Sequence, residues 1–381
     1  MVTRDVMHNP AKHGAAAVTE ADQPDYVDCA VIIVTYNSTR DIAALLDSVP
    51  AAAAGLTLRI IVVDNGSVDD TVERVRDHPG VMCVESGANL GYAGGINVGR
   101  RHAGPCGALA VLNPDLILEP GALHEMFTAL DDPAVGVAVP MLLDFEGRRE
   151  PSLRREPTLA SEAGDALFGS HFKRRPGWMS DVVRDEREYG YRHAVDWASG
   201  AAMLISAACD RAVGAWDERF FLYLEEVDYA VRVRAAGLRV EYVPRARARH
   251  RKAGSGQSSM LLALMAVNRV RYFEKYGRPG RVLRALVLLN QFLRSANPGH
   301  RAALLAVARR SSWEPLIAGL KARPAGAAAA PSPDQPARPD PSSTLTGTES
   351  SEYDPCASYA DLSERPYAFR GPASVSPASY G

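Results

Sequence analysis

Residues 30–35 read Ala-Val-Ile-Ile-Val-Thr, and residues 59–63 read Arg-Ile-Ile-Val-Val. Both runs are apolar and rich in β-branched side chains, which is typical of strands buried on both faces of a sheet. Between and after these two runs, the sequence predicts two further strands at residues 81–85 and 108–112. It also predicts three helices at residues 38–49, 69–77 and 94–102. Strands that alternate with helices in this way predict an α/β layer with a mostly parallel sheet and right-handed crossovers.

Polar side chains and glycines follow each of the four predicted strands. The carboxyl ends of parallel strands meet at one edge of a sheet, and ligands of such folds bind at that edge. The segments that reach it are Thr35-Tyr36-Asn37, Asp64-Asn65-Gly66-Ser67, Asn89 to Gly95 and Asn113-Pro114-Asp115. We therefore expect the binding residues of the first half of the chain to lie in these four segments.

The second half of the chain is less regular. Its apolar patterns predict strands at 201–205 and 238–243 and helices at 227–236, 258–276 and 279–293. We expect one α/β domain over residues 27–257 and a helical segment over residues 258–321. Residues 1–26 are polar and residues 322–381 are rich in proline, alanine and serine, so both ends are expected to be disordered.

Composition narrows the class of protein. Of the 381 residues, 46% are hydrophobic and 23% are charged, and the formal net charge is −2. This is the balance of a globular protein, and it does not indicate a nucleic-acid partner. The five cysteines form no CxxC pair, which favours a reducing compartment over a disulfide framework or a zinc module. Without a signal peptide or a run of roughly 20 apolar residues, the chain is expected to be cytoplasmic.

Two aspartates at the predicted sheet edge have alternative roles. Asp64 follows a buried strand and can accept the imide N–H of a uracil or thymine base, or it can cap the next helix. Asp115 can bind a divalent cation that is shared with substrate phosphates, or it can belong to an ordinary Asn-Pro-Asp turn. Gly91, Gly94 and Gly95 lack the GxGxxG spacing of a dinucleotide site, and they predict a turn that approaches a phosphate or a flexible loop.

Three acids, Glu225, Glu226 and Asp228, follow an aromatic run and open a predicted helix. They can interact with the helix dipole, or partial burial can raise the pKa of one of them and make it a general base. Trp197 can stack on a sugar ring or pack in the core. His250 lies in a basic segment that is predicted to be a loop, where it is either a solvated side chain or a metal ligand.

Taken together, these motifs resemble those of the inverting glycosyltransferases of family 2, and among them the rhamnosyltransferase-like and galactofuranosyltransferase-like members. The motifs span about residues 27–252, and as an ordered set they are highly specific. They are Val34 to Asn37, Val63 to Ser67, Asn89 to Asn97, Leu112 to Asp115, Asp196 to Gly200 and Phe221 to Arg232. The resemblance implies a GT-A fold, in which a Rossmann-like, mostly parallel nucleotide-binding sheet is fused to an acceptor-binding half, here followed by C-terminal helices.

The resemblance also implies roles for individual residues. Glu226 matches the position of the catalytic base, and Asp115 and His250 match the residues that hold a divalent cation, Mn²⁺ or Mg²⁺. The residues implied for the donor nucleotide are Thr35, Tyr36, Asn37, Asp64, Asn65, Asn89, Gly94, Asn97, Asn113 and Asp115. The residues implied for the donor sugar and the acceptor are Trp197, Ser199, Gly200, Glu225 and Asp228.

Two positions depart from the family pattern. The metal motif reads Asn-Pro-Asp, so that one carboxylate of a full DxD motif is missing. The base position holds Glu226 where aspartate is usual, which leaves Glu225 and Asp228 as alternatives for the base.

The implied activity is the transfer of a sugar from a nucleoside-diphosphate donor to a hydroxyl of a glycan or lipid-linked acceptor, in cell-envelope polysaccharide synthesis. The best candidate donor is dTDP-L-rhamnose, and uridine-diphosphate sugars are the alternative. A non-catalytic carbohydrate-binding protein is the rival class. A sugar nucleotidyltransferase would need a GxGTR-type loop where this chain has Thr35-Tyr36-Asn37-Ser38, and the glycine spacing argues against a dehydrogenase.

The predicted C-terminal helices carry basic residues beside apolar stripes. Such helices either lie on an anionic membrane surface, which suits a peripheral protein with a lipid-linked acceptor, or dock on the catalytic domain. The basic residues are Arg269, Arg271, Lys275, Arg278, Arg281, Arg284 and Arg294.

Overall fold

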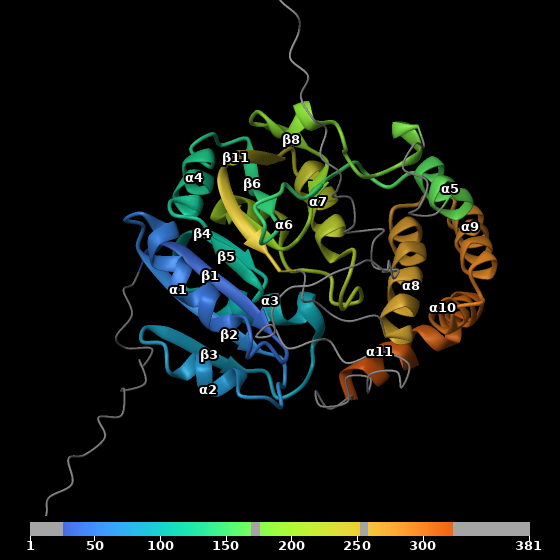
Figure 1. Ribbon diagram of the computed structural model, residues 1–381, viewed down its shortest axis with the longest axis horizontal. Coiled ribbons are helices and arrows are strands. Elements are labelled where there is room, and N and C mark those ends of the chain that lie inside the picture. The colour runs from blue at the N-terminus through green and yellow to red at the C-terminus, as the bar shows by residue number, and fades with distance from the viewer. Residues whose placement is uncertain (1–25, 169–175, 252–257, 323–381) are drawn as a thin grey trace, which may run out of the picture.

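The computed structural model describes residues 26–168, 176–251 and 258–322 (Figure 1). Its centre is a nine-stranded sheet with the strand order β3-β2-β1-β4-β10-β6-β11-β5, in which β8 also pairs with β11. The strands are β1 (Val27–Thr35), β2 (Leu58–Asp64), β3 (Val81–Glu85), β4 (Cys106–Leu112), β5 (Leu116–Leu118), β6 (Val135–Leu143), β8 (His193–Val195), β10 (Ala202–Ser206) and β11 (Arg239–His250). A separate small sheet pairs β7 (Leu153–Arg154) with β9 (Trp197–Ala198).

Most of the sheet is parallel, as expected. The pairs β3-β2, β2-β1, β1-β4 and β6-β11 are parallel, whereas β10 runs antiparallel to both β4 and β6. Strand β1 shows why the layer forms, because its side chains alternate between two buried clusters. Ile32 and Val34 face one cluster, and Val31 and Ile33 face the other. A strand that is apolar on both faces needs a helical cover on each side.

Helices supply that cover (Figure 1). α3 and α7 contribute to the cluster on one face of the sheet, and α1 and α4 contribute to the cluster on the other. The α-helices are α1 (Ile42–Ala53), α2 (Thr71–Arg76), α3 (Gly91–His102), α4 (Ala122–Ala129), α5 (Leu159–Phe168), α6 (Ala207–Val213), α7 (Glu225–Ala235), α8 (Ser259–Lys275), α9 (Gly280–Leu293), α10 (Pro298–Ala308) and α11 (Trp313–Ala322). Short 3₁₀ turns lie at Gly177–Met179, Glu186–Tyr189 and Arg310–Ser312.

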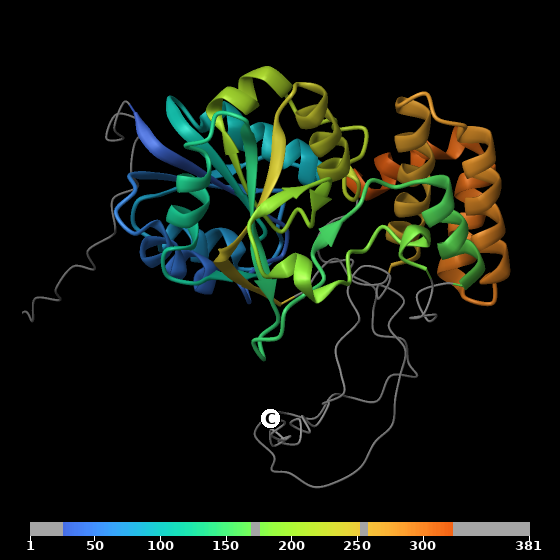
Figure 2. The ribbon, with the colours of Figure 1, turned by 90° about the horizontal axis from the view of Figure 1, so that it is seen from above.

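The C-terminal helices α8 to α11 and the earlier helix α5 form a helical group beside the sheet (Figure 2). Their core is continuous with that of the sheet, since Val267, Val270 and Phe273 of α8 belong to the same buried cluster as Ile32. Among the described residues, no helix is long and apolar enough to cross a membrane. Residues 1–25 and 323–381, which carry almost all of the two expected disordered ends, lie outside the described residues.

The predicted elements of the first half agree with the structure to within a few residues, but two segments differ. α3 begins at Gly91 rather than Gly94, so the glycines of that motif lie in a helix and not in a turn. The segment around His250 is strand and not loop, because β11 continues to His250. Its sequence alternates small buried residues, Ala246 and Ala248, with arginines, and this period of two is the pattern of a strand with one buried face.

Candidate active site

The register of the strands brings the predicted segments to one edge of the sheet. Thr35 pairs with Asp64 across β1 and β2, and Ile33 pairs with Leu112 across β1 and β4. β10 runs in the opposite direction and starts with Ala202 opposite Leu112, so the chain from Trp197 arrives at the same edge. The backbone N–H of Asn113 donates to the carbonyl of Ala201 over 2.8 Å and joins the two segments.

Asp64 is buried and organises the loop that follows its own strand. Its Oδ2 accepts hydrogen bonds from the backbone N–H groups of Gly66, at 3.0 Å, and Ser67, at 2.8 Å. Its Oδ1 accepts from the hydroxyls of Thr35, at 3.0 Å, and Ser67. Asn37, held in the left-handed region with φ of 54°, completes the loop through a bond from its N–H to the Ser67 hydroxyl. In this arrangement Asp64 orders the loop that follows its own strand, whereas the N-cap position of the next helix, α2, is held by Asp70.

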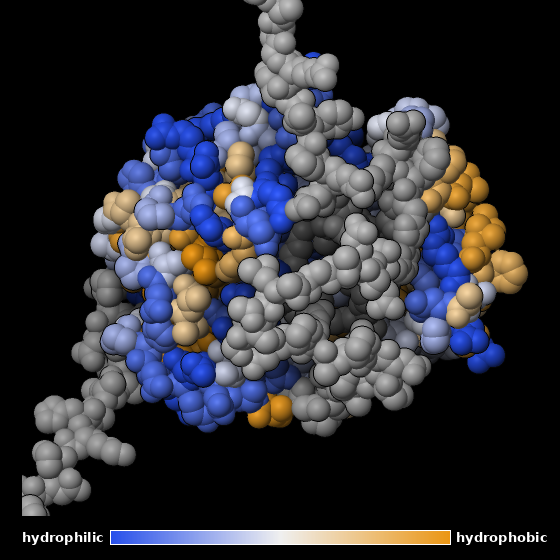
Figure 3. All heavy atoms as spheres, viewed as in Figure 1, coloured by the Kyte–Doolittle hydropathy of each residue, from blue (hydrophilic) through white to orange (hydrophobic). Residues whose placement is uncertain are grey.

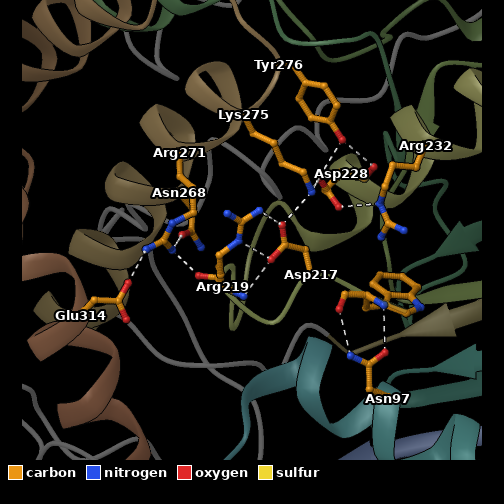
Figure 4. A network of polar contacts seen from close by, with 11 residues as sticks. Asn97, Asp217, Arg219, Asp228, Arg232, Asn268, Arg271, Lys275, Tyr276 and Glu314 are labelled. Atoms are coloured by element: carbon orange, nitrogen blue, oxygen red, sulfur yellow. Dashed lines mark hydrogen bonds and ion pairs between the residues drawn. The ribbon is translucent and has the colours of Figure 1, made fainter. Parts of the chain in front are cut away.

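The asparagines that were predicted to bind the donor nucleotide form hydrogen bonds mainly with backbone groups. Nδ2 of Asn65 donates to the carbonyl of Gly91 at 2.9 Å, and Oδ1 of Asn89 accepts from the N–H of Gly91 at 2.9 Å. Asn97 is buried and joins α3 to a distant loop, with bonds of 2.9 Å to both the N–H and the carbonyl of Trp216 (Figure 4). These contacts explain why asparagines occupy the positions without involving a ligand.

The glycines of α3 allow a close approach to the sheet. A Cβ on Gly95 would lie 2.5 Å from Cγ1 of Val34, and one on Gly94 would lie 2.7 Å from Cβ of Leu90. The first N–H groups of the helix, those of Tyr92 and Ala93, both donate to the carbonyl of Phe221. The expected phosphate-binding turn is therefore a helix start that a backbone carbonyl caps, and the glycines serve packing.

Asp115 lies directly before β5 and His250 is the last residue of β11, and their side chains lie close together. His250 pairs with Leu116 in β5, and this register places Nε2 of His250 3.3 Å from Oδ1 of Asp115. Nδ1 of His250 lies 3.7 Å from Oε2 of the buried Glu150. Burial opposes protonation of the imidazole, but the hydrogen bonds to Asp115 and Glu150 prevail and raise the pKa of His250 to about 9. The part of the chain that the structure describes holds no group of three acids, imidazoles or thiols placed to share one metal ion.

The segment from Trp197 to Gly200 lies along the same edge of the sheet. Trp197 is buried, its indole N–H donates to the carbonyl of Arg155 at 2.8 Å, and it belongs to the main core rather than to an open surface. The backbone N–H of Ser199 donates to the carbonyl of Ser152 at 3.0 Å. A Cβ on Gly200 would meet Cβ of Glu226 at 3.2 Å, so Gly200 is the position where this segment touches the acids of α7.

Glu225 and Glu226 are neighbouring acids at the start of α7, and Glu225 is buried while Glu226 is half-buried. Burial, reinforced by the charge of Glu226, raises the pKa of Glu225 well above its usual range. Burial also raises the pKa of Glu226, but backbone N–H groups and the positive charge of Arg154 oppose it and leave the value at about 7. Among the described residues, Oε2 of each acid is buried and has no hydrogen-bond partner. Of the two acids, Glu225 is therefore the one whose surroundings favour the protonated form more strongly, and Glu226 is the better candidate for a carboxylate that accepts a proton.

Asp228 is fully buried and has a different environment. It pairs with Arg232 at 3.0 Å, accepts a hydrogen bond of 2.7 Å from the hydroxyl of Tyr276, and binds the ammonium of Lys275 (Figure 4). A carboxylate with three such partners is held as a charged structural anchor, and its oxygens face the protein. Of the three acids that open α7, Asp228 is thus the one whose geometry does not suit a general base.

Sequence reasoning missed several residues that line this edge. Burial and the charges of Glu225, Glu226 and Asp115 raise the pKa of Tyr92 well above its usual value, so the tyrosine lies among these acids. Its hydroxyl donates to the carbonyl of Gly200 at 3.3 Å. Arg154 and Glu150 were missed because they follow β6 in a segment without a clear pattern. Tyr92 alone carried a signal, as an aromatic residue within the glycine-rich motif.

The chain is similar to known glycosyltransferases. Residues 30–185 match the model of the family Glycosyl transferase family 2. The N-acetylglucosaminyl-diphospho-decaprenol L-rhamnosyltransferase of Mycobacterium tuberculosis is 33% identical over 238 residues, which are 59% of this chain and 76% of that protein. The low-salt glycan biosynthesis hexosyltransferase Agl10 of Haloferax volcanii is 29% identical over 219 residues, 56% of this chain and 64% of that protein.

Solved structures give weaker likenesses. The mannosyltransferase PcManGT from Pyrobaculum calidifontis, in complex with GDP-Man and Mn²⁺, superposes with a TM-score of 0.46 and 18% identity over 81% of this chain and 82% of that one. GalNAc-T7 with UDP, GalNAc and Mn²⁺ gives a TM-score of 0.45 and 14% identity over 65% of this chain and 49% of that one.

Proposed function

The chain belongs to glycosyltransferase family 2, and on that premise we propose that it transfers a sugar with inversion from a nucleoside diphosphate to an acceptor hydroxyl, with Glu226 as the general base. The observation that carries the proposal is the Glu225–Glu226 pair. Glu225 is buried and Glu226 half-buried at the sheet edge, their surroundings raise the two pKa values to different extents, and each keeps a buried oxygen without a partner among the described residues. Groups separated in this way are suited to acid–base chemistry near neutral pH.

The chemistry of the step follows from these groups. The carboxylate of Glu226 removes the proton of the acceptor hydroxyl while that oxygen forms a bond to the anomeric carbon. The bond from the anomeric carbon to the nucleoside diphosphate breaks on the opposite face, and the diphosphate leaves with the bonding electron pair. Burial favours the protonated form of Glu225, and in that form it can donate a hydrogen bond to a sugar oxygen. Gly200 leaves room beside Glu226, because a side chain there would displace the carboxylate.

A divalent cation, Mn²⁺ or Mg²⁺, fits Asp115 and His250 by the chemistry of the donor set. The pair offers a carboxylate oxygen and an imidazole nitrogen at the strand ends, and a second carboxylate, that of Glu150, lies beside the imidazole. Few protein ligands suffice, because these cations share substrate phosphates and keep waters. When bound, the cation would offset the charge of the leaving diphosphate.

For the donor we propose dTDP-L-rhamnose, with uridine-diphosphate sugars as the alternative. For the acceptor we propose an N-acetylglucosaminyl diphosphate on a polyprenol, in cell-envelope polysaccharide synthesis. Support comes from the similarity to the Mycobacterium tuberculosis relative, an N-acetylglucosaminyl-diphospho-decaprenol L-rhamnosyltransferase. The loops after β1, β2 and β4, with Thr35, Tyr36, Asn37, Asp64 and Asn113, would surround the nucleotide.

A lipid-linked acceptor calls for contact with a membrane surface, and we propose that α9 makes it. The basic residues in and just after α8 do not serve this purpose, since Arg269 and Lys275 of α8 and Arg278 of the turn that follows it pair with acids of the protein. α9 instead exposes Val282, Leu289, Phe292 and Leu293. In Figure 3 hydrophobic residues gather at the right-hand side of the molecule, over the helical group.

The charge around this face favours an anionic bilayer. Residues 280–310 contain no aspartate or glutamate, and their basic residues include the exposed Arg281, Arg301 and Arg309. An apolar stripe flanked only by positive charge is the pattern of a helix that lies in the interface of an anionic membrane. Such a contact would make the protein peripheral on the membrane face that carries the acceptor.

The activity is tested by incubating the full chain with a panel of nucleotide sugars, a polyprenyl-diphospho-N-acetylglucosamine acceptor, and Mn²⁺, Mg²⁺ or EDTA. We expect nucleoside diphosphate to be released from one donor only, with dTDP-L-rhamnose first, and a product of inverted anomeric configuration by NMR. Release should stop with EDTA, and in Asp115→Ala and Glu226→Gln, whereas Glu186→Gln at an exposed ion pair should be unaffected. Silence with every donor, together with no metal-dependent donor binding by calorimetry, would refute the proposal.

A further inference from the structure

The loop that leads into α7 has an unusual backbone. Phe221, Tyr223 and Leu224 all have positive φ angles, of 64°, 72° and 67°. Side chains of L-residues rarely occupy this left-handed region, and runs of such residues persist only where the surroundings hold them. Leu224 is the N-cap of α7, so the conformation of this loop fixes where Glu225 and Glu226 begin.

A single side chain of α8 holds this loop. The amide Nδ2 of Asn268, which is fully buried, donates to the carbonyls of Phe220 at 2.6 Å, Leu222 at 3.0 Å and Tyr223 at 3.1 Å. The carbonyl between them, that of Phe221, faces the other way and accepts from the N–H groups of Tyr92 and Ala93 in α3. The loop is therefore held on two sides, by backbone N–H groups of α3 and by the side-chain amide of Asn268 in α8.

The orientation of that amide is itself fixed. Oδ1 of Asn268 accepts a hydrogen bond of 2.9 Å from Nη1 of Arg271, so its NH₂ group must face the loop (Figure 4). The same guanidinium binds the carbonyl of Arg219 and lies 3.5 Å from Glu314 of α11. Without this hydrogen bond the amide could rotate by half a turn and present its oxygen to the three carbonyls. Arg271 therefore determines that the NH₂ group of Asn268 faces the loop.

We infer that Asn268 is a positioning residue for the Glu225–Glu226 pair, and that α8 thereby contributes to the geometry of the active site. The inference rests on the proposed function. Asn268 does not face the reacting atoms and acts through the loop. Without its donors, the three carbonyls each lose the hydrogen bond from the amide and the left-handed residues can relax, which moves the start of α7. A shift of about 1 Å in a reacting group can cost about 100-fold in rate.

The test compares Asn268→Asp with Arg269→Ala in the full chain. Aspartate has the shape of asparagine but lacks the NH₂ donors. Arg269 follows Asn268 on the same helix, yet its ion pairs join α8 to Glu162 and Asp165 of α5, so its loss is a matched control for damage to the helical group. Active sites are counted by donor binding, so that partial unfolding does not count as slow chemistry.

We expect Asn268→Asp to lower kcat about 100-fold per active site while the KM for the donor stays within about twofold, since the donor loops lie elsewhere. The midpoint of the pH–rate profile should also move, because Glu226 changes its surroundings, and Arg269→Ala should change neither quantity. Normal kcat and an unmoved pH midpoint in folded Asn268→Asp would overturn the inference, and so would equal losses in Arg269→Ala.

A second variant keeps the idea testable if Asn268→Asp does not fold. Arg271→Met leaves Asn268 in place but removes the group that fixes its orientation, and we expect a loss of kcat of about tenfold with an unchanged donor KM. Full kcat in that variant would count against the inference. Failure of the proposed function looks different, because the wild-type chain would then transfer no sugar from any donor.

Discussion

The ammonium of Lys275, in the last turn of α8, binds the carboxylate of Asp228 in the first turn of α7. Tyr276 and Arg232 bind the same carboxylate, which is fully buried. These contacts distinguish Asp228 from Glu225 and Glu226, although the three acids look alike in the sequence. Asp228 joins the helical group to the sheet domain, whereas Glu225 and Glu226 keep buried oxygens without partners among the described residues.

Asp228→Ala should lower the free energy of unfolding by about 3–5 kcal/mol, because it leaves the partly buried Arg232 without its acid and removes one of the two acids that bind Lys275. Chemical denaturation followed by circular dichroism measures the loss. The control is Glu85→Ala, which breaks the exposed Arg76–Glu85 pair and should cost less than about 1 kcal/mol. Equal costs for the two variants would show that the Asp228 cluster contributes nothing special.

Glu226→Gln should reduce kcat by about 10²–10⁴-fold, the usual contribution of a general base. Glu225→Gln should keep most of the activity, since burial raises the pKa of Glu225 and so favours its protonated form, which glutamine mimics. Steady-state rates at saturating donor compare the two variants. The reverse outcome, loss in Glu225→Gln and retention in Glu226→Gln, would move the base to Glu225.

The pH dependence of kcat should report the raised pKa of Glu226. A base must be ionised, so activity should rise with pH up to a midpoint near 7 and fall about tenfold per unit below it. Arg154 lowers that pKa, and Arg154→Met should therefore move the midpoint to higher pH. Arg154→Lys keeps the positive charge and should leave the midpoint in place. A midpoint near 4.5 in the wild type would show that Glu226 is not the group that titrates.

Much of the fold could be predicted because its strands are buried on both faces. Runs such as Ile32 to Val34 have no polar alternation, and they fix strands β1, β2 and β4 within a few residues. The family and the enzyme class were likewise predicted from ordered motifs, and both are confirmed by the similarity to glycosyltransferases of family 2. Residues 116–195 were not assigned. Strand β6 lies there between β10 and β11 and contains Pro140, a residue that argues against a central strand.

The roles of single residues were harder to predict, because their partners come from distant segments. Lys275 and Asn268 lie on a helix later in the chain, so no local pattern distinguishes Asp228 from Glu226. Asn97 and Trp197 sit within recognisable motifs, yet their partners are the backbone of Trp216 and of Arg155. The contact of Asp115 with His250 follows from the register of β5 on β11, and the sequence does not state that register. Roles at the donor and metal positions stay predictions.

Gly95→Ala should lower the free energy of unfolding by about 1–3 kcal/mol, as expected for overpacking. The new Cβ would lie 2.5 Å from Cγ1 of Val34, which cannot withdraw from the core. Gly177→Ala is the matched control, because a Cβ there meets nothing within 4 Å. Thermal unfolding of both variants checks the difference. A neutral Gly95→Ala would show that α3 can lift away from the sheet without cost.

Membrane contact through α9 can be tested without the enzyme's substrates. The full chain should sediment with vesicles of phosphatidylcholine and phosphatidylglycerol, and it should do so less at high salt, because surface charges are screened there. The double variant Phe292→Ser and Leu293→Ser removes two exposed apolar side chains from the face of α9 and should bind less than the wild type. Vesicles of phosphatidylcholine alone should retain little protein.

Val68→Ser is the control for this variant, because Val68 is equally apolar and exposed but lies in the loop after β2, on the sheet half of the molecule. Its binding should equal that of the wild type. If the α9 double variant binds as well as Val68→Ser, the face is not a membrane contact. If neither form binds anionic vesicles at low salt, the acceptor lipid must reach the active site by a route that does not involve this helix.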